Sequence, residues 1–130
     1  NIALSFLAKK LNLEYDLFGS IMHSREMQAK KIAEKLISYK LPIIILGSSY
    51  KPNVHHIDGS YSLLIGHYVK KLSNQFLAYD ENVSKTPCVY LLGHRGRFHD
   101  FDFNKDSIIL DPWREFKNDS LKVIYYGSKV

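Results

Sequence analysis

The chain has 130 residues, of which 45% are hydrophobic and 13% aromatic, enough for one folded domain or one domain with an appendage. No stretch is long and apolar enough to cross a membrane, and the single cysteine, Cys88, excludes an internal disulfide framework and fits a cytoplasmic protein. The net charge of +5 favours anionic partners such as phosphates or nucleotides, but no helix-turn-helix, zinc or ribonucleoprotein pattern indicates a nucleic-acid binder.

Residues 1–12 are predicted to form a helix that is apolar on both sides. Ile2 and Phe6 lie opposite a face made of Ala3, Leu4, Leu7, Ala8 and Leu11. A helix that is apolar nearly all round is normally buried on several sides. We therefore expect further chain or a partner subunit to cover it, and the start inside a helix indicates a piece of a longer protein.

A second helical region follows. A short turn through Met22 is predicted with Asp16 as its cap, and then a helix that Ser24 caps and that ends near Tyr39. The face of this helix that we expect to be buried consists of Ala29, Ile32, Ala33, Leu36 and Ile37.

Five short apolar runs predict strands at residues 42–46, 76–79, 88–92, 107–110 and 121–126. Between the first two strands lies a predicted helix over residues 60–72, with Ser60 as its cap. The link of about eight residues between the second and third strands is too short for a helical crossover and must cross as coil. The pattern predicts an α/β fold: a Rossmann-like, mostly parallel five-stranded sheet with flanking helices and an α-helical amino-terminal appendage.

The loop at residues 47–59 follows the first strand, and ligands bind at the carboxyl ends of strands in open α/β sheets. It is not a dinucleotide-binding loop, because Gly47 has no second and third glycine at the required spacing. On its residues alone, a surface connection without a ligand is an equally good interpretation.

The order of short motifs along the chain is more specific than any one motif. The first strand ends in Leu46-Gly47, and then Tyr50-Lys51, Ser60, a helix and Tyr79-Asp80 follow in turn. This order resembles the carboxyl-terminal domain of the UDP-glucose/GDP-mannose dehydrogenase family. Residues 89–94 and 109–114 are similar to two later strands of that domain. Residues 1–14 are similar to the end of the family's central dimerisation helix.

The resemblance implies an NAD-dependent enzyme that oxidises the C6 alcohol of a nucleotide sugar such as UDP-glucose to a carboxylate. Residues 1–38 would belong to the end of the central domain, and residues 39–130 would form a Rossmann-like domain that binds the nucleotide sugar. NAD and the catalytic cysteine would belong to parts of the protein outside this stretch, which therefore holds no catalytic residue. A homodimer through the amino-terminal helices is implied as well.

The resemblance also implies three nucleotide-sugar-binding residues, Tyr50, Lys51 and Arg114. Lys51 matches the family's loop lysine, which contacts the bound substrate, and an ammonium group suits a pyrophosphate. Arg114 matches an arginine that reaches the sugar nucleotide, where a planar guanidinium suits paired oxygens. The alternative for Arg114 is an ion pair with Asp111 or Glu115.

Two other polar clusters carry weaker signals. His55-His56 and Asp58 have no second cluster at ligand spacing, so no metal site is predicted. His94, Arg95 and Arg97 crowd one loop, which either meets a phosphate or is a solvated basic loop.

A second function stays open. The loop departs from the family between residues 54 and 59, where Asp58 places an anion in the position of a cation. The alternative is therefore a diverged, non-catalytic dimerisation or partner-binding module of the same fold. Cys88 is predicted to be a core thiol, and Trp113 is predicted to pack at the edge of the core rather than to serve as a stacking platform.

Overall fold

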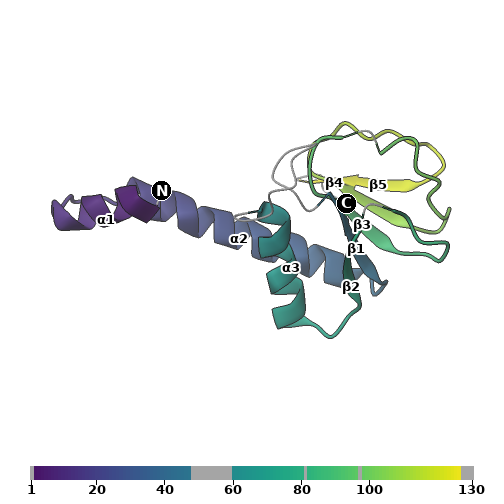
Figure 1. The fold of residues 1–130 in the computed structure, drawn as a ribbon, viewed down its shortest axis with the longest axis horizontal. Coiled ribbons are helices and arrows are strands. Elements are labelled where there is room, and N and C mark those ends of the chain that lie inside the picture. The colour runs from purple at the N-terminus through teal and green to yellow at the C-terminus, as the bar shows by residue number, and fades with distance from the viewer. Residues whose placement is uncertain (1, 48–59, 81, 97, 127–130) are drawn as a thin grey trace.

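A computed structural model describes residues 2–47, 60–80, 82–96 and 98–126 of the chain. Its elements, shown in Figure 1, are α1 (Ile2–Lys10), α2 (Leu17–Ser38), β1 (Ile43–Leu46), α3 (Tyr61–Leu72), β2 (Leu77–Asp80), β3 (Val89–Leu92), β4 (Ile108–Asp111) and β5 (Lys122–Tyr125). None of the helices in these ranges has the length and hydrophobicity of a membrane-spanning segment.

The five strands form one sheet in the order β2-β1-β3-β4-β5, and every neighbouring pair is parallel. The interior strand β1 pairs on both sides, so that Ile43 stands opposite Leu77 on β2 and Val89 on β3. The prediction of a Rossmann-like α/β fold with a parallel five-stranded sheet is confirmed. The strand order reverses at β1, which places a topological switch point between β1 and β3.

Both faces of the sheet are buried, as parallel strands require. Side chains alternate along each strand, so Ile43 and Ile45 face one side and Ile44 and Leu46 the other. The helices α2 and α3 cover the first face, and the coil links on either side of β4 cover the second (Figure 1). The side chains that these links bury on the second face are Phe98, Phe103 and Phe116.

The helix α2 is longer than the sequence indicated. The predicted turn through Met22 with a new cap at Ser24 is wrong, because one helix runs from Leu17 to Ser38. Asp16 is the N-cap, and its carboxylate accepts a hydrogen bond from the backbone N–H of Gly19 at 2.9 Å. No proline interrupts the helix after this cap. The exposed Ser24 inside the helix lowers helix stability by only roughly a few tenths of a kcal/mol, so the helix continues through it.

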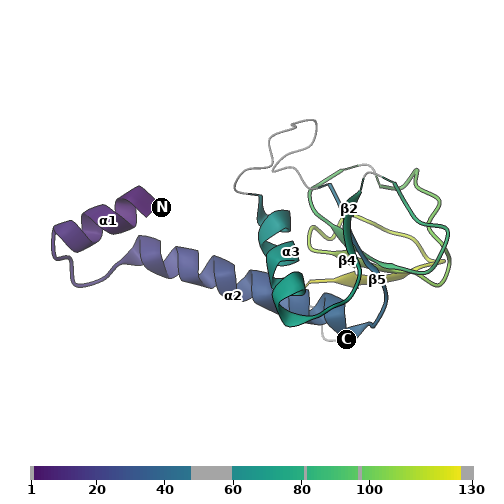
Figure 2. The same ribbon diagram turned by 60° about the horizontal axis from the view of Figure 1, so that its bottom comes forward.

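The first helix, α1, folds back along the amino-terminal half of α2, and the pair extends away from the sheet (Figures 1 and 2). Ser5 and Ala8 are the buried residues of α1, and the Ser5 hydroxyl donates a hydrogen bond to the Asp16 carboxylate. The other sides of α1 remain open, with Ile2 79% exposed and Phe6 68% exposed. The described chain thus covers one side of a helix that is apolar nearly all round.

The carboxyl-terminal half of α2 packs on the sheet. Ala29, Ala33 and Leu36 are fully buried in the same core as β1, β3 and α3. Residues of the predicted segment 1–38 therefore contribute to the core of the sheet that follows them.

We predict that Leu36→Ala lowers the free energy of unfolding of the whole chain by about 2–5 kcal/mol, the usual cost of emptying a core site of this size. Leu17→Ala on the same helix is the matched control, because Leu17 is 53% exposed. It should change the free energy by about 0.5 kcal/mol or less in the same urea titration. Equal effects of the two substitutions would contradict the placement of α2 in the core.

Candidate functional site

The backbone approaches itself closely at the switch point of the sheet. Gly47 follows β1 and Gly93 follows β3, and the Gly93 N–H donates to the carbonyl of Leu46 at 2.7 Å. A Cβ on Gly93 would lie 2.1 Å from the Gly47 carbonyl oxygen, so only glycine fits at this place. The hydroxyl of Ser62 on α3 lies 3.4 Å from the Gly47 carbonyl and 3.5 Å from that of Gly93. This contact fixes the beginning of α3 against the two strand ends.

Two of the three predicted binding residues, Tyr50 and Lys51, lie outside the described residues, between β1 and α3 in sequence. The cluster of His55-His56 and Asp58 lies there too. Ser60 occupies the N-cap position of α3 as predicted, with an extended backbone, although its side chain makes no capping hydrogen bond.

The third predicted residue, Arg114, is exposed and follows β4. Its Nη2 donates to the backbone carbonyl of Tyr126, just after β5, at 3.2 Å. The Glu115 carboxylate pairs instead with Arg95 at 3.3 Å, and both of these side chains are at least half exposed, so the pair stabilises little. The guanidinium of Arg114 thus stands at the carboxyl edge of the sheet.

The residue that holds this turn is Asp111, which sequence reasoning considered only as a partner for Arg114. Its buried carboxylate accepts hydrogen bonds from the backbone N–H groups of Trp113, Glu115 and Phe116 at 2.8, 2.9 and 2.8 Å. An aspartate at a strand end before a proline is the signal of such a side-chain-to-backbone turn. Asp111 therefore sets the backbone conformation from which Trp113 and Arg114 project.

Trp113 packs at the edge of the core, in agreement with the prediction. Its indole N–H donates to the Leu92 carbonyl at 3.0 Å, while 39% of the residue remains exposed. The Arg95 guanidinium lies 6.0 Å from the centre of its ring, at the limit of a cation–π contact.

A cavity of about 210 Å³ opens beside Trp113, between α2, α3 and the carboxyl ends of β3 and β4. Most of its walls are apolar or aromatic, and they include Ile32, Tyr61, Ile65, Leu91, Trp113 and Tyr126. It lies on the helix-covered face of the sheet. Concave, mostly apolar sites at the carboxyl ends of strands are where small molecules bind in this class of fold.

The hydroxyl of Tyr61 in this cavity is inaccessible to solvent and has no hydrogen-bond partner among the described residues. An unsatisfied buried hydroxyl costs about 1–3 kcal/mol. Burial, with a smaller contribution from Tyr126, raises the pKa of the Tyr61 hydroxyl, and Arg25, whose guanidinium lies 5.4 Å from the ring centre, partly opposes this. The group therefore keeps its proton at neutral pH. In the sequence Tyr61 is only one residue of the helix predicted over residues 60–72.

The basic loop after β3 makes internal contacts. His94 shares a hydrogen bond between its Nδ1 and the Arg95 carbonyl at 2.7 Å, and its ring lies so close to Gly47 that a Cβ there would stand 2.4 Å away. Arg95 pairs with Glu115, and Arg97 lies outside the described residues. The described part of this loop therefore favours a packed and solvated loop over a phosphate site.

No group of three potential metal-binding side chains occurs among the described residues. Cys88 is buried in the coil-covered face of the core, as predicted, and its backbone N–H donates to the Ser107 hydroxyl at 3.1 Å.

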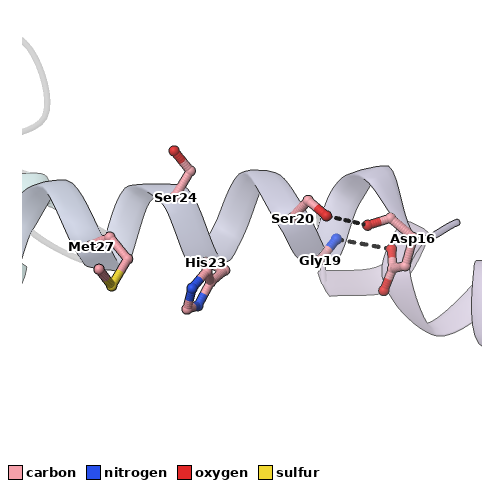
Figure 3. A pocket seen from close by; sticks show the side chains of 6 residues that line it. All are labelled: Asp16, Gly19, Ser20, His23, Ser24 and Met27. Atoms are coloured by element: carbon pink, nitrogen blue, oxygen red, sulfur yellow. Dashed lines mark hydrogen bonds between the residues drawn. The ribbon is translucent and has the colours of Figure 1, made fainter.

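A hollow of about 560 Å³ runs along the first turns of α2, and Figure 3 shows its lining. Its lining residues are half-buried or exposed, and its polar groups near Asp16 serve the helix cap. The Asp16 carboxylate accepts from Gly19 and its backbone carbonyl accepts from the Ser20 hydroxyl at 3.1 Å (Figure 3). We do not regard it as the functional site.

Comparison of the chain with models of known families, with characterised proteins and with solved structures found no match. The resemblance to the dehydrogenase family therefore stands as a hypothesis on the motifs of the sequence alone.

We predict that Asp111→Ala destabilises the protein by about 3 kcal/mol, because the buried N–H of Phe116 and the part-buried N–H groups of Trp113 and Glu115 lose their acceptor. Asp119→Ala serves as the control, since Asp119 is exposed in the same link between β4 and β5, and it should cost about 0.5 kcal/mol or less. Chemical denaturation of both variants measures the difference. A cost for Asp111→Ala no larger than that of the control would show that the turn does not depend on this carboxylate.

Proposed function

We propose that this chain is the nucleotide-sugar-binding domain of an NAD-dependent nucleotide-sugar 6-dehydrogenase of the UDP-glucose type. The observation that carries the proposal is the parallel order β2-β1-β3-β4-β5. In this order β1, which Tyr50 and Lys51 follow in the sequence, ends at the switch point, and Arg114 follows β4 at the same edge of the sheet. Ligands of doubly wound sheets bind at such a place.

The chemistry of the implied residues suits a nucleoside diphosphate. Lys51 supplies a compact positive charge for a pyrophosphate. One N–H group of Arg114 donates a hydrogen bond to the Tyr126 carbonyl. Because a guanidinium has five N–H donors, the remaining ones are available for hydrogen bonds to phosphate or sugar oxygens. The role of the domain is then to hold the nucleotide sugar so that its C6 alcohol reaches the reacting groups.

The residues of this chain do not fit an NAD site. Gly47 after β1 is followed by serines rather than by the further glycines that let a backbone approach a dinucleotide. NAD, which accepts the two hydrides removed from C6, and the nucleophilic cysteine would be supplied by another part of a longer protein.

We predict that calorimetric titration of the chain with UDP, UDP-glucose and GDP-mannose gives weak, saturable binding of one nucleotide class. Lys51→Ala should weaken it about 10-fold or more, because a charge-assisted hydrogen bond is worth about 1.5–3 kcal/mol. Lys71→Ala is the matched control, since Lys71 is exposed at the far end of α3, and it should leave the affinity unchanged. An affinity that Lys51→Ala leaves unchanged, or that is equal for all three compounds, would count against the proposal.

The alternative function, a non-catalytic dimerisation or partner-binding module, is favoured by the outward surface of α1 and by the altered loop at residues 54–59. Ile2 and Phe6 on α1 and Leu11 just after it are all more than half exposed, and large exposed apolar patches on a protein often mark an interaction surface. A homodimer through the amino-terminal helices is common to both functions. Dimerisation without any nucleotide binding would favour the module over the enzyme.

We predict that the chain sediments as a dimer at micromolar concentration and that Phe6→Asp shifts it toward the monomer, because a charge on α1 would be desolvated in the interface. Phe76→Asp is the control. Phe76 is 64% exposed before β2, away from α1, so a charge there should leave the dimer intact. A wild-type chain that stays monomeric in analytical ultracentrifugation would contradict the dimer.

A further inference from the structure

The imidazole of His94 is held in a fixed position at the switch point of the sheet. His94 follows β3, and its ring packs so closely on Gly47, just after β1, that a Cβ on Gly47 would lie 2.4 Å from both Cδ2 and Nε2. Nearer the other ring nitrogen, a Cβ on Gly96 would lie 3.0 Å from Cε1 and 3.1 Å from Nδ1. The ring of Phe98 also lies against the imidazole, with the ring centres 5.5 Å apart. These neighbours fix the orientation of the ring by packing, as a binding residue requires.

The hydrogen bond at Nδ1 decides which ring nitrogen carries the proton. Nδ1 of His94 lies 2.7 Å from the carbonyl oxygen of Arg95. A carbonyl oxygen can only accept a hydrogen bond, so Nδ1 is the protonated nitrogen. In the neutral imidazole the other nitrogen, Nε2, then presents a lone pair and acts as an acceptor.

This acceptor is without a partner and is accessible. Nε2 of His94 makes no hydrogen bond to the described residues. The one buried side-chain atom that lacks a partner in that part of the chain is the hydroxyl oxygen of Tyr61, so Nε2 retains contact with solvent. The His94 residue as a whole is half-buried. A fixed acceptor thus lies at the carboxyl edge of the sheet, where ligands bind in this class of fold.

An acceptor selects the part of a nucleotide sugar that it can bind. Phosphate oxygens are themselves acceptors, so they do not pair with a neutral Nε2. The hydroxyl groups of the ribose and the sugar, and the N–H groups of the base, are donors. Arg95 in the same loop pairs with Glu115 at 3.3 Å, which reduces the positive charge available there for a phosphate.

We propose that Nε2 of His94 is a further contact of the nucleotide-sugar site and accepts a hydrogen bond from a hydroxyl or N–H group of the nucleotide sugar. This inference rests on the proposed function. Lys51 and Arg114 supply positive charge for the diphosphate, and His94 recognises a group that a diphosphate alone does not have. The three residues together favour a whole nucleotide over a free phosphate.

The first test observes the ring nitrogens by long-range ¹H–¹⁵N NMR of the chain at mildly alkaline pH, with His94→Gln to assign the signals. In the free chain Nδ1 of His94 should carry the proton. Addition of UDP-glucose should shift the Nε2 signal saturably and leave Nε2 unprotonated. A proton on Nε2 in the free chain or in the complex, or an Nε2 signal that does not move, would overturn the proposal.

The second test compares two variants of similar size by calorimetry. His94→Leu removes the acceptor, whereas His94→Gln keeps an acceptor oxygen. His94→Leu should weaken UDP-glucose binding roughly 3- to 10-fold, the value of one neutral hydrogen bond, and His94→Gln should restore most of the loss. His99→Leu is the matched control and should leave the affinity unchanged, because His99 is exposed and stacks on Phe116 with the ring centres 4.9 Å apart. An unchanged affinity of His94→Leu, or equal losses in the Leu and Gln variants, contradicts the contact.

The outcomes separate this inference from the proposed function. If the wild-type chain binds no nucleotide, the proposed function fails and the His94 contact fails with it. If binding depends on Lys51 but not on His94, the proposed function stands and only this inference is overturned. Titration with UDP locates the donor. Equal weakening of UDP and UDP-glucose by His94→Leu places the donor on the uridine part, and weakening of UDP-glucose alone places it on the sugar.

Discussion

A parallel sheet must be covered on both faces, and the described part of this chain places helices on only one of them. The strand β1 is buried at all four of its residues, with α2 and α3 above one face. The helix α1 lies elsewhere, against the amino-terminal half of α2. The second face is therefore covered by coil, and the phenylalanines of the links before and after β4 supply the apolar surface that a helix would otherwise provide. Tyr90 and Phe103 meet edge to face there, with their ring centres 5.0 Å apart.

Coil that lies on a core needs other partners for its backbone polar groups, because it has no helical hydrogen bonds. Side chains provide them here. The Asp111 carboxylate accepts hydrogen bonds from three backbone N–H groups. The Tyr125 hydroxyl donates to the Phe116 carbonyl at 2.7 Å, and the Tyr90 hydroxyl accepts from the Ser84 N–H at 2.8 Å. Asn104 donates to the Lys85 carbonyl at 2.8 Å. These bonds hold the layer that positions Trp113 and Arg114, so both candidate sites depend on how the second face is covered.

Local patterns predicted the strands to within a residue or two, because short apolar runs such as residues 43–46 have few other possibilities in a sheet buried on both faces. The cap at Asp16 was predicted, but α2 was divided into a turn and a helix because Ser24 also resembles a cap in sequence. The contact of Asp16 with Ser5 on α1 is tertiary and could not be predicted. The partnerless hydroxyl of Tyr61 and the three bonds of Asp111 arise from tertiary contacts and leave no periodic signal. The binding roles of Tyr50 and Lys51 come from the resemblance and remain predictions.

The position of β1 between β2 and β3 also limits the order in which the molecule can fold. Its neighbours are β2 and β3, so β1 finds a partner on either side only after residues 77–80 and 89–92 have left the ribosome. Contacts between segments so distant in sequence form late, since the intervening loops must close first. The α1–α2 pair joins neighbours in sequence and needs no such closure. During synthesis, the four aliphatic residues of β1 therefore remain without strand partners at a stage when the helical hairpin of α1 and α2 can already have formed.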